Sequence, residues 1–447
     1  MGKYNDKLMN MNNFKSPLTT FLVVLCVFSL KAQEVIKLSS INEAFALAKN
    51  KNYTFVNAEL QKNIAELTKK AAVGNVFNPR VPTTIQALDN MNQQVSFLPA
   101  EAFGGPAGTF KQVTIGQQYV STFAIMPQFE IFNFSNLAQV KSSKINEALV
   151  DNQNKLNEQQ LYNKINSIYS NILSFNGQKE VLQENLVLAE NIQTIIKQKF
   201  DEGLVRMQEV NEAEVNVISI KDKLEQLEVN LKMQYQLLNL FFENQASSEV
   251  TESIWNYENS STITQAKNNL DVENTHLQRL LAKQEYKSLR YQNFPSLSFV
   301  SSFSWQNLSN ESFFSSQSNN TNFNYLGLKL NLDLPTAQRI ANTRNKSIQV
   351  KMLSNSEEHA VKENEIKNQQ LLLDYDKALK QAENYKKIVS LKKDTYDKNY
   401  NQFKENILSL DKLLISQNDM LVSKLNLVVA LANISFNKNK IDINNKF

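Results

Sequence analysis

Turn-forming residues are scarce in this chain. Of its 447 residues only 9 are glycine and 8 are proline, about 4% together, whereas average usage is roughly 7% glycine and 5% proline. Because turns and phosphate-binding loops need these residues, the composition argues against a loop-rich β-sandwich and a glycine-rich nucleotide-binding fold. Collagen-like sequence and Pro/Gly-rich disorder are excluded as well. With 42% hydrophobic and 21% charged residues, the chain has the composition of a folded protein.

Side chains that commonly carry catalysis are also few. Cys26 is the single cysteine, and His276 and His359 are the only histidines. Two histidines so far apart exclude H-E-x-x-H and other histidine-bearing zinc motifs. No glycine begins a phosphate-binding loop or a nucleophile elbow, and the carboxylates are spread along helical faces. The sequence therefore predicts a protein that is not an enzyme and has no cofactor or metal site.

Residues 1–32 resemble an export signal rather than a folded segment. Lysines precede a 13-residue apolar run over 18–30, and Ala32 supplies a small residue for cleavage. A membrane-spanning helix needs about 20 residues. This leader carries most of the formal net charge of +4, so no nucleic-acid surface is predicted. Cys26 lies within the apolar run, which leaves a lipid-anchored form as a weaker alternative.

The placement of the proline residues favours long helices. Residues 135–294 and 336–447 contain no proline, and a proline inside a helix costs about 3 kcal/mol. Val210, Val217 and Leu224 begin a seven-residue apolar repeat that is typical of a coiled coil. The pattern predicts long helices over about 135–200, 204–242, 336–402 and 407–437.

Between these helices, apolar and polar residues alternate. Leucine and aromatic residues at 297, 299, 303 and 305 alternate with serines at 296, 298, 302 and 304, which is the period of a strand with two different faces. We predict four strand segments in two pairs, each pair enclosing a polar loop, and no apolar helix that spans a membrane. The strands are placed at about 81–92, 112–133, 295–306 and 323–334.

The chain also contains an internal duplication, in which positions of the first half recur in the second. Asn52, Leu60 and Ala65 correspond to Asn269, Leu277 and Ala282, and Phe200 and Val210 correspond to Phe403 and Leu413. This spacing is too long for a solenoid, whose period is about 20–50 residues. We predict a first half over 33–243, a linker over 244–267 and a second half over 268–440, each half with the order helix, strand, strand, long helix, helix.

An exported chain with such strands suggests an outer-membrane β-barrel. Strands of this kind turn apolar residues toward lipid and polar residues toward a wet lumen, with aromatic residues at the membrane interfaces. Because four strands cannot close a barrel and open edges are not tolerated in lipid, several chains would have to pool their strands. The alternative is a set of hairpins on a soluble helical protein. The candidate interface aromatics are Tyr119, Phe123, Phe303, Trp305, Phe323 and Tyr325.

Over residues 38–440 the sequence resembles the TolC-type outer-membrane efflux and secretion ducts. The most specific match is the segment 199–205, which contains Phe200 and Gly203 and is followed by Glu209-Val210. In that family the segment is a helix-turn-helix tip. A second tip corresponds to residues 403–408, with Asn406 in the position of the glycine. Asparagine also tolerates the left-handed conformation that such a turn needs.

The resemblance implies a mainly α fold with a β-barrel contribution. Three chains would form a homotrimer with a twelve-stranded outer-membrane barrel, continued by a periplasmic α-helical coiled-coil barrel. The implied function is a passive exit duct of a tripartite efflux or type I secretion system, working with a periplasmic adaptor and an inner-membrane pump. The residues that would contact the adaptor are Gly203, Leu204, Val205, Asn406, Ile407 and Leu408.

One departure from the family concerns the lumen. Members with an acidic constriction have aspartates six and nine residues after the second-tip glycine, where this chain has Lys412 and Ile415, with Asp411 alongside. A lysine in the lumen would favour anions. The transported substrate stays open. A rival reading is a periplasmic coiled-coil scaffold or adaptor protein without a membrane barrel, which would have no use for the alternation over 297–305.

Overall fold

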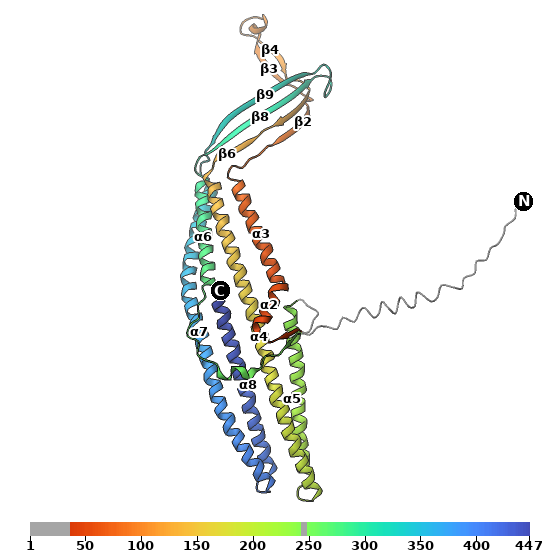
Figure 1. Ribbon diagram of the computed structural model, residues 1–447. Helices are drawn as coiled ribbons and strands as arrows, with labels where there is room; N and C mark the ends of the chain where they lie inside the picture. The colour runs from red at the N-terminus through yellow and green to blue at the C-terminus, as the bar shows by residue number, and fades with distance from the viewer. Residues whose placement is uncertain (1–35, 243–247) are drawn as a thin grey trace, which may run out of the picture. The chain divides into compact units, whose positions relative to one another are not determined.

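The computed structural model describes residues 36–242 and 248–447. The predicted leader and Cys26 therefore lie outside the described residues. The chain forms two compact units. Of the described residues, the first unit, here called the helical unit, contains 36–56, 157–242, 248–268 and 366–447; the second, the sheet unit, contains 57–156 and 269–365. Long helices and a curved sheet are the main elements (Figure 1).

The helices come in two matching sets. Helices α3 (Tyr53–Gly74) and α6 (Leu270–Tyr291) both have 22 residues, and α4 (Phe134–Asp201) and α7 (Ala337–Lys404) both have 68. The first residues of α3 and α6 are as far apart in the sequence as Asn52 and Asn269. Those of α4 and α7 are as far apart as Phe200 and Phe403. The duplication seen in the sequence is therefore a duplication of helices. A shorter helix, α2 (Ile41–Lys51), precedes the first set.

Two further helices complete the helical unit, α5 (Met207–Leu240) and α8 (Leu410–Lys446). The heptad residues Val210, Val217 and Leu238 are buried in its core. Contrary to the expectation from sequence, α8 is long and apolar enough to cross a membrane by length and composition. However, 56% of its most apolar window is buried within the protein, which is the situation of a core helix.

Gly177 allows the segment before α6 to approach α4 closely. A Cβ atom at this position would lie 2.7 Å from Ile254 Cγ2 and 2.9 Å from Val428 Cγ1. Both distances are shorter than ordinary van der Waals contact, so any larger residue would push these side chains apart. This packing explains why a glycine stands within a 68-residue helix.

The predicted linker over 244–267 has structure of its own. Strand β7 (Ser248–Val250) pairs in parallel with β1 (Ile36–Leu38), and a 3₁₀ helix, η2 (Ile254–Asn259), follows. Between them, Glu252 accepts hydrogen bonds from the hydroxyls of Tyr169 (2.6 Å) and Tyr257 (2.8 Å). Burial raises the pKa of Tyr257 to about 12, with a further contribution from the Glu252 carboxylate, and burial raises the pKa of Tyr169 as well. Both tyrosines therefore stay neutral donors at physiological pH.

Four strand paths form one antiparallel sheet in the sheet unit. Strand β2 (Thr83–Asp89) pairs with β5 (Tyr119–Ile125), and β8 (Ser296–Ser309) pairs with β5 and β6 (Gln128–Phe132) on one side and with β9 (Asn319–Asn331) on the other. Because the order is β2, β5 with β6, β8, β9, strands β2 and β9 are the two edges. Among the described residues, no strand pairs with the outer side of either edge.

The predicted single strand over 112–133 is wrong. The structure divides it into β4 (Phe110–Ile115), β5 and β6. Pro127 separates β5 from β6, because proline has no backbone N–H for the ladder. Gly116, with φ of 97°, lies between β4 and β5. The turn at Gly116 sends β4 away from the sheet.

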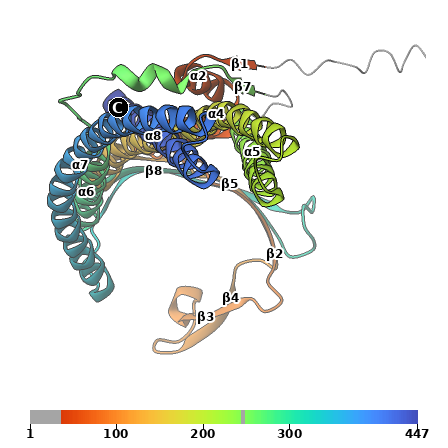
Figure 2. The ribbon, with the colours of Figure 1, turned by 90° about the horizontal axis from the view of Figure 1, so that it is seen from below.

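Strand β4 pairs instead with β3 (Gln94–Pro99), and the 3₁₀ helix η1 (Ala100–Phe103) lies in their connection. This β3–β4 hairpin occupies the segment that the sequence pattern suggested was largely a polar loop. It makes the connection from α3 to α4, over 75–133, longer than the connection from α6 to α7, over 292–336. Figure 2 shows the hairpin on the concave side of the curved sheet.

Candidate functional site: two helical tips and a two-faced sheet

The first tip joins α4 to α5. At Gly203 the backbone has φ of 76°, the left-handed region that favours glycine. The Gly203 N–H donates to the Phe200 carbonyl (2.9 Å), and the Leu204 N–H donates to the Lys199 carbonyl (2.8 Å). These bonds satisfy the last carbonyls of α4, as in a Schellman C-cap. The chain then reverses and α5 begins at Met207.

The second tip, between α7 and α8, repeats this geometry. Asn406 has φ of 58°, and its N–H donates to the Phe403 carbonyl (3.2 Å). The Ile407 N–H donates to the Gln402 carbonyl (2.9 Å). The duplication relates Asn406 to Gly203 and Ile407 to Leu204, so these two hydrogen bonds are equivalent to those of the first tip. Asparagine therefore replaces glycine at a position that needs a left-handed residue, which is the substitution with the smallest steric cost.

The six residues predicted to contact an adaptor divide into two groups. Leu204 is 62% exposed and Ile407 is 74% exposed, and both left-handed residues, Gly203 and Asn406, are exposed. Val205 and Leu408 are half-buried and pack against the apolar cluster beneath the tips. That cluster contains residues of α4, α5, α7 and α8, including Ile192, Val210, Phe403 and Leu413. Of these six residues, one large apolar side chain at each tip is thus exposed to solvent above a shared core.

Lys199 connects the two tips, and sequence reasoning missed this role. Its ammonium group donates to the Phe403 carbonyl (3.0 Å) and to Asn406 Oδ1 (2.7 Å), and it lies 4.3 Å from the centre of the Phe403 ring. A charged donor, two oxygen acceptors and an aromatic face together make a stronger contact than a neutral hydrogen bond. The residue was part of the matched motif, but its partner lies in the other half of the chain.

We expect Lys199→Met to loosen the second tip, because methionine keeps the apolar stem but loses both hydrogen bonds. A hydrogen bond from a charged group contributes about 1.5–3 kcal/mol, so exchange of the Ile407 and Leu408 amides should rise roughly ten-fold or more. Hydrogen–deuterium exchange measured on residues 402–410 checks this. Lys197→Met, at an exposed lysine one half-turn earlier, should leave the exchange unchanged. Equal exchange in the two variants would contradict the contact.

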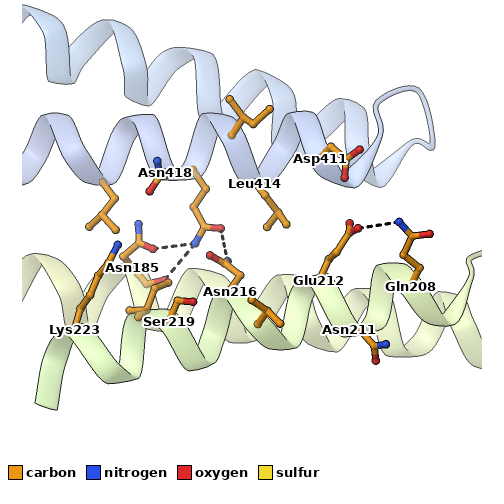
Figure 3. Close-up of a pocket in the computed structure, with 15 residues that line it drawn as sticks. Asn185, Gln208, Asn211, Glu212, Asn216, Ser219, Lys223, Asp411, Leu414 and Asn418 are labelled. Atoms are coloured by element: carbon orange, nitrogen blue, oxygen red, sulfur yellow. Dashed lines mark hydrogen bonds between the residues drawn. The ribbon is translucent and has the colours of Figure 1, made fainter.

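A groove of about 870 Å³ lies between α5 and α8 beside the tips. Gln417 is a buried residue of the lining: its amide donates to Asn185 Oδ1 (3.0 Å) and its carbonyl oxygen accepts from Asn216 Nδ2 (3.1 Å), and Figure 3 labels both asparagines. The groove walls combine amides with apolar residues, among them Val215 and Ile415. The walls also carry the charged residues Glu212, Lys223 and Asp411.

The two residues predicted at a lumen constriction lie next to each other but differ in surroundings. Both side chains are exposed, but Asp411 lines the groove from α8, whereas Lys412 is not one of the lining residues. Ile415, at the position of the family's second aspartate, also lines the groove and is exposed. In the described part of the chain, no group of three or more metal-ligating side chains is present.

The sheet has one apolar and one polar face. Strand register sets which residues share a face, since paired residues point the same way. On the apolar face, Phe123 stacks on Trp305 (5.6 Å between ring centres) and Phe129 on Phe299 (5.0 Å). The other apolar-face residues include Ile85, Ile125, Leu297, Phe303, Leu326, Leu328 and Leu330. The polar face includes Gln86, Thr122, Glu130, Ser298, Ser302, Ser304, Gln306, Thr321 and Lys329.

The register separates the six candidate interface aromatics. Tyr119, Phe123, Phe303 and Trp305 lie on the apolar face. Phe323 and Tyr325 lie on the polar face, opposite Ser304 and Ser302. The six residues therefore cannot all face lipid, because a strand residue can reach only one face of its sheet. The sequence of β9 alternates large residues on both faces, so only its pairing with β8 decides the orientation.

No model of a protein family matches the sequence, and no curated protein is a significant sequence match. Solved structures do match. The outer membrane protein VceC of Vibrio cholerae has a TM-score of 0.64 at 13% identity, covering 90% of this chain and 94% of VceC. The outer membrane channel CmeC of Campylobacter jejuni has a TM-score of 0.66 at 12% identity, covering 90% and 85%. The outer membrane channel MtrE of Neisseria gonorrhoeae has a TM-score of 0.67 at 11% identity, covering 91% and 88%.

These matches extend over nearly the whole chain and nearly the whole of each channel. They confirm, at the level of fold, the resemblance that the tip motifs indicated. The similar structures are channel proteins and not enzymes. At 11–13% identity the likeness fixes the architecture, and function has to be argued from the residues themselves.

Proposed function

We propose that this chain, which has the fold of the TolC-type outer-membrane channels, is one subunit of a trimeric, passive exit duct in the outer membrane. The observation that carries the proposal is the sheet, with its apolar face, its polar face and two edges that have no strand partner within residues 36–242 and 248–447. In lipid every backbone polar group needs a partner, so such a sheet is stable in a membrane only when its edges are closed.

Copies of the same chain supply the closure most simply. If the β2 edge of one copy pairs with the β9 edge of the next, each copy contributes four strand paths to a ring. Three copies then give twelve strands, enough for a barrel whose polar face surrounds a water-filled lumen. Leu328 and Trp305 would face lipid, and Ser302 and Lys329 would line the lumen.

The helical unit would continue this path through the periplasm. By likeness to the family, its two tips would meet a periplasmic adaptor that connects the duct to an inner-membrane pump, in a tripartite efflux or type I secretion system. The exposed Leu204 and Ile407 supply apolar contacts for an adaptor helix. The duct itself would use no energy. An adaptor that binds the separated tips more tightly than the closed ones would shift the population toward an open lumen.

Membrane fractionation tests the proposal. We expect the full-length chain in the outer-membrane fraction, as a complex that runs as a trimer without heating and as a monomer after boiling. A periplasmic coiled-coil scaffold without a barrel would be recovered in the soluble periplasm. Soluble recovery, or a membrane form without trimers, would overturn the duct.

A further inference from the structure

We propose that the β3–β4 hairpins of three copies meet on the axis of the barrel and form a lid over its outer mouth. This inference rests on the proposed trimeric duct. It concerns residues 94–115, which have no counterpart in the second half of the chain among the described residues.

The position of the hairpin is the first argument. It extends from the end of the sheet that is far from α3 and α6 (Figure 1), and it lies on the concave side of the sheet (Figure 2). When a curved sheet closes into a ring with its copies, the axis of the ring lies on the concave side. Rotation about that axis gathers the three hairpins, whereas residues on the sheet itself stay apart.

The exposed side chains are the second argument. Phe97 is 66% exposed and Phe110 is 67% exposed, and the register places both on one face of the hairpin together with Val95. The opposite face exposes the apolar residues Leu98, Phe103 and Ile115. Only Glu101 and Lys111 carry charge within residues 94–115. A cluster of this kind in a single copy indicates an interaction surface.

The hairpin is also held in place at its base. Asn310, in the connection from β8 to β9, accepts hydrogen bonds through Oδ1 from Gln93 Nε2 (3.1 Å) and from the Gln118 N–H (3.0 Å). Asn90 adds two bonds across the base, from its side chain to the Gln117 carbonyl (3.1 Å) and from its N–H to the Gln118 carbonyl (2.8 Å). These bonds fix the direction in which the hairpin leaves the sheet.

These observations together indicate what covers the exposed aromatic side chains of the hairpin. Lipid is excluded from the concave side of a closed barrel, so water or another copy of the hairpin has to cover the aromatic side chains. Contact among three copies removes Phe97 and Phe110 from water, which is favourable because both side chains are apolar. The lid would therefore close without a further protein and would open when the hairpins separate.

Cysteine cross-linking in the assembled protein tests the lid. A single cysteine joins two copies only where it meets its own symmetry equivalent, which requires a position near the axis. In outer membranes carrying the F97C variant, a short bismaleimide should give covalent dimers. Q317C, on the exposed loop between β8 and β9, should give few or none.

A second variant measures what the lid does. Replacement of residues 94–115 by Gly-Ser should leave the heat-sensitive trimer intact and, in whole cells carrying K329C on the polar face, should raise the labelling of this cysteine by a bulky maleimide added from outside several-fold. Normal trimers that show no F97C linkage above the Q317C level, or an unchanged K329C labelling after the replacement, would overturn the lid and leave the duct standing. Absence of trimers from every variant would overturn the duct and the lid together.

Discussion

Export is expected to stop when Gly203 is replaced by proline, although trimers should still assemble in the outer membrane. Gly203 has a left-handed φ of 76°. The ring of proline holds φ in the negative range and cannot adopt that conformation. Proline also removes the N–H that donates to the Phe200 carbonyl. The turn between α4 and α5 would have to rebuild, which moves the exposed Leu204 away from its position at the tip. Since the strands belong to the other compact unit, barrel formation should not depend on this turn.

The measurement is growth of a strain lacking the chain, complemented with each variant, on a panel of dyes, bile salts and metal ions. Gly203→Pro should grow like the empty strain on every compound where the wild-type chain gives an advantage. Gly203→Asn is the matched control, because Asn406 adopts the same left-handed geometry in the second tip. It should restore growth. Full growth with Gly203→Pro would show that the tip does not take part in export.

The tips and the long helices could be predicted from the sequence because their signals are local. A helix of 68 residues needs an absence of proline and a continuous apolar stripe, and both can be counted along the chain. The left-handed residue of each tip is one position, glycine or asparagine, directly after a helix end. Such features depend on a few neighbouring residues and need no knowledge of the partner segment.

The features that were missed depend on distant partners. The Lys199 ammonium group donates a hydrogen bond to Asn406 Oδ1, and no neighbouring residue in the sequence indicates this contact. In β9 the large residues Tyr325 and Leu326 are adjacent, so the alternation does not show which of them lies on the apolar face. Only the pairing of β9 with β8 assigns their faces. The breaks at Gly116 and Pro127 can be seen in the sequence, but the pairing of β4 with β3 instead of the sheet involves a separate segment. Periodicity gives the number of faces, whereas register decides which residues occupy each.

Substitution of Leu326 by lysine is expected to abolish the outer-membrane trimer. Leu326 is exposed on the apolar face, opposite Ser301 and in the register that also places Phe303 on that face. A lysine facing lipid near the middle of a membrane costs about 2–4 kcal/mol. The trimer would carry that cost three times, against a total stability of about 5–15 kcal/mol for a typical domain. Unheated electrophoresis of outer membranes should show the wild-type trimer and little or none for the variant.

The neighbouring residue supplies the control that makes this test specific for the face. Tyr325→Lys adds the same charge one position away, but the register turns it toward the polar face, where Lys329 already lies and Ser302 is its partner. A lysine there stays in contact with water in the lumen, so the trimer should form at near wild-type yield. If lysine is tolerated equally at both positions, the apolar face does not contact lipid. If the trimer is lost with Tyr325→Lys and kept with Leu326→Lys, the two faces are reversed, and Phe323 and Tyr325 belong to the lipid-facing surface.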